Sequence, residues 1–551
     1  MKRFLFLFLL WLASCTVSYA QQGILSGKVT EMESNAPVAC ATVRIISLGV
    51  SAITDPSGFF DISNLPYGNY ILSVSGENYG STEIPVEVNA ESISIPPIQL
   101  TRSVKQEGIS EISRVILDLE DENKDQNISG LLHASDDIFV STAGYTFGSM
   151  FFRPRGYDSE NSDVWMNGAF MNEAENGRVV WSNWGGLNDA VRNKDVYYVL
   201  NPTPLAFSNI GGLTNIVTSA SQYRKQIKAS YSYSNRMYHN RAMLTYSSGL
   251  MKGGWAVTVS GSRRWAQEGY IEGTFYDAWA YFLAAEKRLG EKHSLALTVF
   301  GAPTRRGQQA AAVQEAYDLT GSNYYNPHWG YQNGEKRNAR VKQFHEPVFI
   351  LNHFFNINDR TKLTTTASYI FGTDSWSSLT WYNAPDPRPD YYRYLPSYQT
   401  DTLVKEMVTW NWENNMNTRQ INWDHLYQVN YLANTVNHQA NYIVENNITQ
   451  YNQFGLSSHV NKEMSSHVTV SGGLNFRWYR AEHYKVIKDL LGGKFWVDID
   501  QYAQQDFPGD SNIIQNDLNN PNRVVYEGDK FGYDYVAHIN NLNLWGQSEF
   551  S

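Results

Sequence analysis

The sequence predicts a mainly β protein in three parts: a small β-sandwich, a mixed α and β domain, and part of a transmembrane antiparallel β-barrel. Three observations favour this fold class. Short strands separated by regular turns fill residues 21–100, which is typical of a sandwich. Segments with alternating apolar and polar residues recur beyond residue 220, as in barrel strands. The chain is also rich in Tyr (36) and Trp (16), which suit strands with one apolar and one polar face.

Residues 1–20 form a predicted secretory signal peptide. Lys2 and Arg3 precede the apolar run 4–12, and Ser18-Tyr19-Ala20 supplies small residues before the expected cleavage site. The apolar run is too short for a stable membrane anchor. An alternative stays open, because Leu12-Ala13-Ser14-Cys15 resembles a bacterial lipoprotein box, which would place a lipid on Cys15.

The net charge and the cysteine content limit which partners and covalent links the protein can have. The net charge of -10 argues against a nucleic-acid partner. If Cys15 leaves with the signal peptide, Cys40 is the only thiol and no internal disulfide can form. Cys40 falls in the strand-like segment 38–45, so we expect it to be a small core residue.

Residues 21–100 contain an Asp-Pro-Ser-Gly turn, a Phe pair and a Leu-Pro-Tyr-Gly turn between alternating segments. They resemble the carboxypeptidase-regulatory-like, transthyretin-like domain. The resemblance rests on a short set of positions, namely Pro37, Thr54-Asp55, Gly58-Phe59, Leu65-Pro66, Gly68 and Tyr70. It implies a structural accessory domain without catalysis.

Residues 101–127 are predicted to be an acidic linker. In "DLEDENKDQN", Asp121, Asn123 and Asp125 alternate as in a calcium loop, but Gln126 replaces the required glycine, so we predict no metal site. The preceding "EISRVILDLE" alternates briefly and could add a strand to a partner sheet.

Residues 128–220 carry three short motifs. "FFRPRGY" places Arg153 and Arg155 around a proline, "DVWMNG" is a strand that ends in the hairpin signal Asn167-Gly168, and "NIGGLTNIVT" is a glycine turn that leads into an apolar strand. In this order they resemble the plug domain of a TonB-dependent outer-membrane receptor. Together with the signal peptide and the preceding domain, the resemblance is to the Bacteroidota type.

Residues 221–551 are predicted to form the barrel. "WAVTVSG", "HSLALTVF", "KLTTTASYIF" and "HVTVSGGLNFRW" alternate in the manner of barrel strands, and long polar, aromatic-rich stretches separate them. Plugged outer-membrane transporters have about 22 strands. Since this region has room for only part of that number, we expect an incomplete barrel in a C-terminally truncated chain.

The resemblance implies energised uptake of a bulky nutrient (a glycan, a peptide or a chelate) across the cell outer membrane. The implied partners are a TonB-type periplasmic energy-coupling protein, outer-membrane lipid and a surface lipoprotein. TonB-contact candidates lie in the alternating segment before the plug, at Glu111, Ile112, Val115, Ile116 and Leu117. We predict that Arg153 and Arg155 lock the closed plug, and that Gly156 permits the tight turn beside them. Ligand-binding residues are not predicted.

An enzyme and a surface-displayed binding protein are two other classes of function that a secreted β-rich chain could have. An enzyme is not expected, because the sequence has no His-Glu-x-x-His, Cys-x-x-Cys or Gly-x-Ser-x-Gly motif and no phosphate loop. We therefore predict no cofactor. A surface-displayed, secreted β-rich binding or adhesion protein without transport stays as the alternative. It predicts a water-soluble body after residue 220, whereas a barrel predicts detergent dependence.

Overall fold

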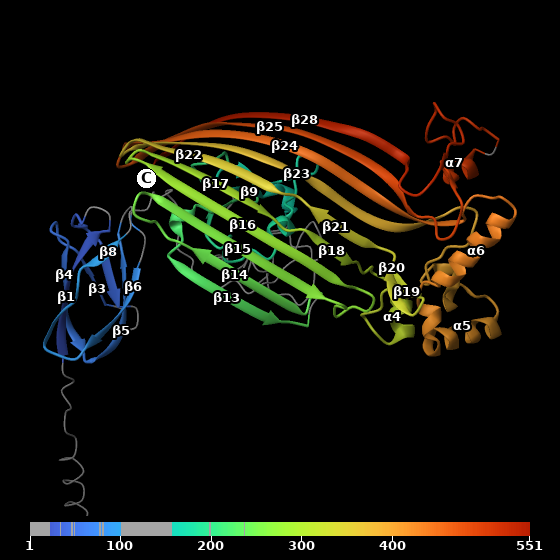
Figure 1. Cartoon of the computed structure of the whole chain (residues 1–551), viewed down its shortest axis with the longest axis horizontal. Coiled ribbons are helices and arrows are strands. Elements are labelled where there is room, and N and C mark those ends of the chain that lie inside the picture. The colour runs from blue at the N-terminus through green and yellow to red at the C-terminus, as the bar shows by residue number, and fades with distance from the viewer. Residues whose placement is uncertain are drawn as a thin grey trace, which may run out of the picture. The chain divides into compact units, whose positions relative to one another are not determined.

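The computed structural model describes residues 22–100 and 157–550, apart from residues 33–34, 46–47, 49, 77–78, 80–81, 198–199, 236 and 508. It divides into two compact units, Met1–Ile109 and Ser110–Ser551, whose strands and helices are labelled in Figure 1. Strands dominate both units, as the sequence predicts. Within these residues, no helix has the length and apolar character needed to cross a membrane.

The first unit consists of two four-stranded sheets that face each other across an apolar core. One sheet has the order β4-β1-β7 with β8 also paired to β1, and the other has the order β3-β2-β5-β6. Leu25, Val43, Phe60 and Leu72 are among the buried core residues. The strands are β1 (Gln22–Glu31), β2 (Thr42–Ile45), β3 (Val50–Ile53), β4 (Phe59–Pro66), β5 (Gly68–Ser75), β6 (Thr82–Val88), β7 (Ser92–Ser94) and β8 (Ile98–Leu100).

The motif residues of this unit stabilise its turns. The buried Thr54 hydroxyl accepts a hydrogen bond from the Ala41 amide at 2.8 Å and donates one to the Val38 carbonyl at 2.7 Å. Gly58 has φ +79°, and a Cβ there would lie 2.5 Å from the Val29 carbonyl oxygen, so glycine is required. The expectation for Cys40 is wrong: it is exposed, in a turn with φ +57° ahead of β2, rather than in the core.

The second unit begins with a small sheet that we call the plug sheet. Its order is β10-β9-β12-β11, where β9 and β12 run parallel and the other pairs are antiparallel. Its strands are β9 (Asp163–Met166), β10 (Ala169–Phe170), β11 (Lys194–Tyr197) and β12 (Leu213–Ile216). The 3-10 helices η3 (Ser159–Asn161), η4 (Trp181–Trp184) and η5 (Ala220–Gln222) belong to the same region.

The hairpin predicted at Asn167-Gly168 is confirmed. These two residues connect β9 to β10, with φ +49° and +82°. Positive φ at both central positions defines the type I′ turn, whose twist matches that of the flanking strands. Two of the three motifs that suggested a plug meet here, because β9 and β12 are parallel neighbours in one sheet.

A twelve-stranded antiparallel sheet, which we call the wall, forms the rest of the second unit. Its order is β13-β14-β15-β16-β17-β22-β23-β24-β25-β28, with β18 and β21 continuing it beside β16 and β23. The strands are β13 (Gln226–Tyr233), β14 (Asn240–Ser247), β15 (Trp255–Ala266), β16 (Tyr276–Leu289), β17 (His293–Gly301), β18 (Thr304–Gly307), β21 (Val341–His345), β22 (Val348–Asn358), β23 (Thr361–Trp381), β24 (Tyr442–Ser465), β25 (Val468–Asp489) and β28 (Lys530–Phe550). Among the described strands, β13 and β28 lie at its edges.

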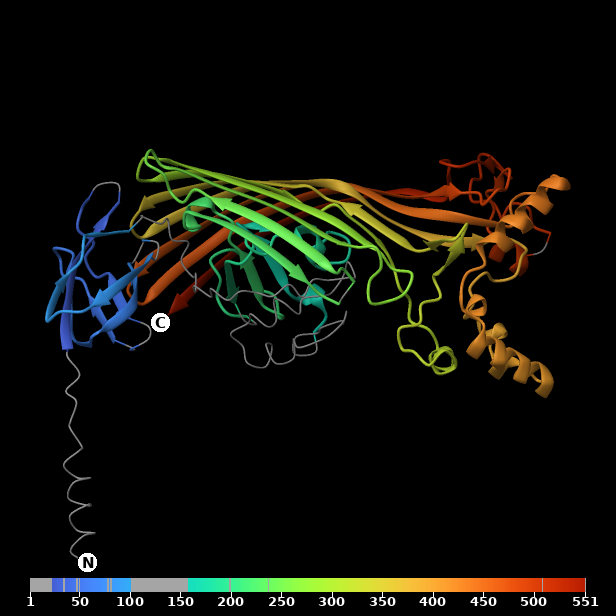
Figure 2. The ribbon, with the colours of Figure 1, turned by 60° about the horizontal axis from the view of Figure 1, so that its bottom comes forward.

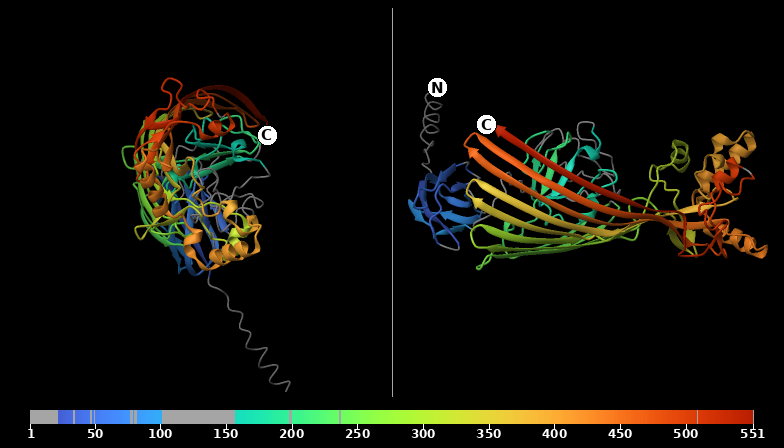
Figure 3. Two further views of the ribbon diagram at one scale, coloured as in Figure 1. Left: turned by 90° about the vertical axis from the view of Figure 1, so that its right-hand side faces the viewer. Right: turned by 90° about the horizontal axis from the view of Figure 1, so that it is seen from above.

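The wall is curved, and the plug sheet lies against its concave face (Figure 2, Figure 3). Burial alternates along the strands; in β16, for example, every second residue from Tyr276 to Ala284 is buried. The concave face carries small and polar residues together with buried apolar residues that meet the plug, such as Phe282. Other apolar residues, such as Leu283 and Leu297, are exposed on the convex face. This is the two-faced pattern that the alternating segments predict.

The two ends of the wall differ. Short turns at 248–254, 290–292, 359–360 and 466–467 close one end. Long connections at 308–340, 382–441 and 490–529 lie at the other end, where the helices gather (Figure 1). These connections contain α4 (Gln314–Thr320), α5 (Thr402–Asn414), α6 (Trp423–Thr435), α7 (Gln501–Asp506), η6 (Tyr392–Tyr394), η7 (Pro396–Tyr398), η8 (Met416–Arg419), β19 (Trp329–Gln332), β20 (Glu335–Asn338), β26 (Trp496–Val497) and β27 (Val524–Val525).

Candidate functional site

The candidate site is the seat of the plug hairpin tip on the wall. Within the plug, Asn167 Oδ1 accepts a hydrogen bond from the Thr218 amide at 2.8 Å, and Asn167 Nδ2 donates to Thr218 Oγ1 at 2.7 Å. Both side chains are fully buried. The asparagine of the hairpin signal therefore fixes the end of the second motif, and the backbone carbonyls of the tip stay free to meet the wall.

Side chains from neighbouring wall strands hold that tip. Asn352 Nδ2 on β22 donates to the Asn167 carbonyl at 2.6 Å, and Thr366 Oγ1 on β23 donates to the same oxygen at 3.0 Å. Ser457 Oγ on β24 donates to the Gly168 carbonyl at 2.6 Å. Because β22, β23 and β24 are adjacent in the wall, one backbone turn is held by three strands at once.

A fourth strand contacts the seat through Thr218, the plug residue that is hydrogen-bonded to Asn167. Thr218 Oγ1 lies 3.2 Å from Thr298 Oγ1 on β17, which neighbours β22. The close approach requires a glycine in the tip, since a Cβ on Gly168 would lie 2.9 Å from Thr366 Oγ1. The seat is thus a buried set of neutral hydrogen bonds that connect the turn to three strands and Thr218 to a fourth.

A second contact joins the plug's Trp-Gly loop to β15. Arg264 is only 2 % exposed, lies against the rings of Tyr238 and Tyr276 at 5.8 and 5.4 Å, and donates from Nη1 to Tyr276 Oη at 3.0 Å. A Cβ on Gly185 would lie 2.9 Å from Arg264 Nη2, and one on Gly186 would lie 2.5 Å from Ser262 Oγ. The glycines therefore let the loop pack directly on this arginine.

A third contact lies on β25. Arg477 Nη1 donates to the Asn172 carbonyl at 2.8 Å, and its guanidinium lies 5.0 Å from the Phe170 ring centre. Glu175 Oε1 accepts from Tyr479 Oη at 3.1 Å and is 2.7 Å from His483 Nε2. Here the plug contact is charged and partly exposed, in contrast to the neutral, buried seat.

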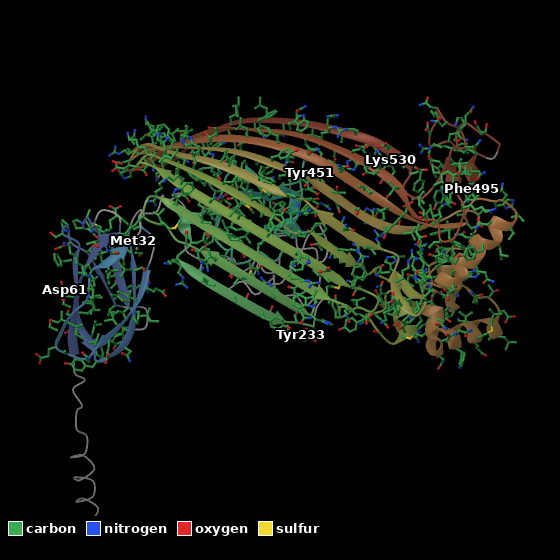
Figure 4. All side chains as sticks on the ribbon, viewed as in Figure 1. Met32, Asp61, Tyr233, Tyr451, Phe495 and Lys530 are labelled. Carbon is green, nitrogen blue, oxygen red and sulfur yellow. The ribbon has the colours of Figure 1, made fainter. Side chains whose placement is uncertain are left out.

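Apolar packing continues beneath these polar contacts. One buried cluster contains plug residues such as Met166 and Leu187 together with wall residues such as Phe282 and Ile350. Tyr451, labelled midway along β24 in Figure 4, packs against this cluster. The plug and the wall therefore share one core.

A cavity of about 610 Å³ lies between the plug and the wall beside the seat, and Gly168, Thr366 and Ser457 are among its lining residues. Trp165 and Phe170 line it from the plug, and Gln453, Asn475 and Arg477 line it from the wall. The lining is aromatic and amide-rich, with Arg477 at one side.

One carboxyl group of the plug sheet, that of Asp195, is buried, and a second, that of Asp163, is half-buried. Burial raises the pKa of Asp195 to about 7, although a 3.2 Å hydrogen bond from Asn215 lowers it in part. Burial likewise raises the pKa of Asp163, which borders the cavity, to about 6. Among the described residues, groups of His, Cys, Asp and Glu that could hold a metal ion are absent.

The site residues predicted from the sequence lie outside the described residues. This holds for the TonB-contact candidates at 111–117, for Arg153, Arg155 and Gly156, and for the lipidation candidate Cys15. Sequence reasoning missed Asn352, Thr366 and Ser457, which lie on strands whose alternating pattern marks only a polar face. The hairpin signal at Asn167-Gly168 was the one pointer toward the seat.

Both units of the chain are similar to known proteins. Among curated proteins, none matches this chain. The fold is similar to that of the siderophore receptor PiuA from Acinetobacter baumannii (12% identity, 73% of this chain and 49% of that chain, TM-score 0.40). A second similar structure is the closed form of the ferric-catecholate import receptor Fiu from E. coli K12 (11% identity, 74% of this chain and 58% of that chain, TM-score 0.37). A third is the ferripyoverdine receptor of the outer membrane of Pseudomonas aeruginosa (9% identity, 61% of this chain and 38% of that chain, TM-score 0.36).

The chain spans about half the length of these three receptors. The first unit matches a domain family directly: the carboxypeptidase regulatory-like domain covers residues 24–101. That span contains the Thr54 and Gly58 turns described above. Residues 24–101 belong to the carboxypeptidase regulatory-like domain family.

Proposed function

We propose that the chain functions as a TonB-dependent outer-membrane receptor that takes up a bulky nutrient, such as a glycan, a peptide or a chelate. The wall spans the outer membrane, and the plug closes its lumen until a TonB-type periplasmic protein pulls on it. The observation that carries this proposal is the seat of the hairpin tip, where three wall strands hold the turn of a separate small sheet and a fourth contacts Thr218, the residue bound to Asn167.

The chemistry of the seat suits a closure that can be opened. Its contacts are neutral hydrogen bonds, each of which contributes about 0.5–1.5 kcal/mol to stability because water can replace the lost partner. The shared apolar core holds the plug in place when no force acts. A pull from the periplasm would break these bonds one after another, and water entering the cavity would satisfy the groups released.

The convex face of the wall supports a place in the membrane. Trp255 and Trp265 point to this face at the two ends of β15, ten residues apart. At about 3.3 Å per residue the separation is about 33 Å along the strand, or about 25 Å along the membrane normal at a tilt of about 40°. That height matches the apolar band of outer-membrane barrels, whose borders are aromatic.

The two ends of the wall support its orientation. Outer-membrane barrels have short periplasmic turns and longer extracellular loops. The turns such as 290–292 would therefore face the periplasm, and the helical connections such as 382–441 would face the outside. The proposed TonB contact at residues 111–117 then acts from the periplasmic side, where the energy-coupling protein is found. The surface lipoprotein partner stays a prediction from the sequence resemblance.

The alternative is a secreted binding or adhesion protein that is displayed at the surface. A water-soluble protein would not expose an apolar convex face that includes Leu244, Leu297 and Leu351. The transport proposal accounts for that face and for the buried polar seat together.

Uptake by cells that produce the full chain tests this function. Labelled neutral oligosaccharides, peptides and ferric chelates are supplied with and without a protonophore, and a variant lacking residues 111–117 is compared with the intact chain. We expect uptake of one class to stop in both cases while surface binding persists. Uptake that is unchanged by the protonophore and by the deletion would contradict the proposal. A failure to take up any of the three classes of ligand would also contradict it.

A further inference from the structure

Two arginines lie on the convex face of the wall near its loop end. Arg263 on β15 and Arg305 on β18 flank Asp277 on β16: Arg305 is directly opposite Asp277, and Arg263 is opposite Trp279, two residues further along β16. Their neighbours Arg264 and Arg306 point to the other face and are buried. The strand alternation therefore directs Arg263 and Arg305 outward, away from the plug.

Aromatic rings hold the Arg263 guanidinium. It lies 5.3 Å from the Trp265 ring centre and 4.8 Å from that of Trp279. The Asp277 carboxylate is 3.4 Å from its Nε and Nη2, and the side chains of Arg263 and Asp277 stay 42% and 51% exposed. Contacts with ring faces restrict the arginine without using up its hydrogen-bond donors.

The Arg305 guanidinium is held in the same way but has no acid of its own. It lies 4.7 Å from the Phe275 ring centre, and its side chain is exposed. In the part of the chain that the structure describes, Arg305 has no ion-pair partner. The patch of Arg263, Asp277 and Arg305 thus carries two positive charges and one negative charge, and its guanidinium N–H groups can donate hydrogen bonds to an anion.

The depth of the patch explains why arginines can face outward here. Arg263 and Trp265 lie on the same face as Trp255, eight and ten residues along β15 from it. If Trp255 marks the periplasmic border of the apolar band, Trp265 marks the opposite border. An outward arginine in mid-bilayer destabilises a barrel by about 2–4 kcal/mol, whereas at the border the effect falls to about 0–1 kcal/mol. There the guanidinium reaches the polar head groups.

We propose that Arg263 and Arg305 form a binding site for the phosphate of an outer-leaflet lipid. Guanidinium groups bind phosphate in a bidentate manner, and the surrounding indole rings suit the boundary between acyl chains and head groups. The site rests on the proposed membrane placement but not on transport. A lipid is the source of the phosphate because the donors face outward among lipid-facing rings rather than into a pocket.

Native mass spectrometry of the full chain in neutral detergent tests the site. The probes are diphosphoryl lipid A, phosphatidylcholine as a lipid without net charge, and inorganic phosphate. The variants are Arg305→Gln, Arg263→Gln/Arg305→Gln, and the control Arg360→Gln, which alters an exposed arginine in a short turn at the other end of the wall. We expect lipid A retention to weaken about fivefold in Arg305→Gln, since one basic residue near an anionic surface is worth about 1 kcal/mol. In the double variant it falls more than tenfold, and in Arg360→Gln it stays unchanged.

Each contrary outcome overturns the site. Equal loss in Arg360→Gln would mean a general charge effect, and unchanged retention in the double variant would exclude these residues. Displacement by inorganic phosphate would exclude a site that requires a lipid, and equal retention of phosphatidylcholine would exclude a site that selects an anionic lipid phosphate. Uptake is measured on the same variants: a chain that binds lipid A through these arginines but transports nothing would keep this site and overturn the transport proposal.

Discussion

The carboxypeptidase regulatory-like domain and the plug are both small β structures, yet they are stabilised in different ways. The first domain buries its own core between two sheets, with Leu25, Val43 and Leu72 fully inside it. The plug sheet has four short strands, and its core is completed by wall residues such as Phe282 and Ile350. The plug therefore depends on the wall for part of its core, although Trp165, Leu205 and Leu213 form a small buried cluster within the plug itself.

The largest expected effect comes from opening the shared core. Phe300 is fully buried on β17, and its ring meets Trp184 of the plug edge-on at 6.4 Å. Phe300→Ala should destabilise the second unit by about 3–5 kcal/mol, through lost burial and the cavity left behind. Hydrogen exchange should accelerate in both β17 and residues 181–187. Faster exchange in β17 alone would mean that the plug has an independent core.

A matched substitution in the first domain should stay local. Leu72 is fully buried on β5, and Leu72→Ala should destabilise that domain by about 3 kcal/mol. Because the two compact units have separate cores, exchange in β9 to β12 should not change. Acceleration in the plug strands would show a coupling that the separate cores do not explain.

A smaller effect is expected at the hairpin tip. Gly168 combines φ +82° with a Cβ position 2.9 Å from Thr366 Oγ1, whereas Gly334 has the same φ and nothing within 4 Å of its Cβ position. Both Gly→Ala variants carry backbone strain of about 1 kcal/mol. Gly168→Ala should additionally loosen the seat, with faster exchange in β9 and β10 and increased leakage of small solutes. Equal exchange rates and equal leakage in the two variants would mean that the close approach of Gly168 to Thr366 has no role in closing the plug.

The smallest effect tests the buried carboxyl of the plug. Because burial raises the pKa of Asp195 to about 7, above the usual value of about 3.9, the folded plug binds this proton more tightly than the unfolded chain. The contribution of Asp195 to stability therefore falls as pH rises from about 4 through about 7, by about 1.4 kcal/mol between pH 6 and pH 8. Burial lowers the pKa of the neighbouring Lys194 to about 7, and this shift acts in the opposite direction over the same pH range. Asp195→Asn should flatten this dependence in β11 exchange, and Asp359→Asn, an exposed control in a wall turn, should not. Persistence of the full pH dependence in Asp195→Asn would assign it to another group.

The sequence predicted local features of the plug better than its seat. The Asn167-Gly168 pair predicts a hairpin, because a type I′ turn needs positive φ at both central positions and Asn and Gly adopt it readily. The alternation of apolar and polar residues predicts the wall strands. The partners of the turn cannot be read in this way: Asn352, Thr366 and Ser457 are brought together by strand register over about three hundred residues. Cys40 was misplaced because a strand-like run conceals the turn at its start.

A reversible tether between plug and wall tests the central claim most directly. Thr218 Oγ1 and Thr298 Oγ1 lie 3.2 Å apart across the seat, and Thr245 Oγ1 and Ser260 Oγ lie 2.6 Å apart within the wall. In a Cys40→Ser background, the pair Thr218→Cys/Thr298→Cys would link the plug to β17, and Thr245→Cys/Ser260→Cys would link two wall strands as a control. When oxidised, the first pair should abolish uptake until a reductant is added, while the control pair transports normally throughout. Full uptake with the plug covalently held to β17 would contradict the account.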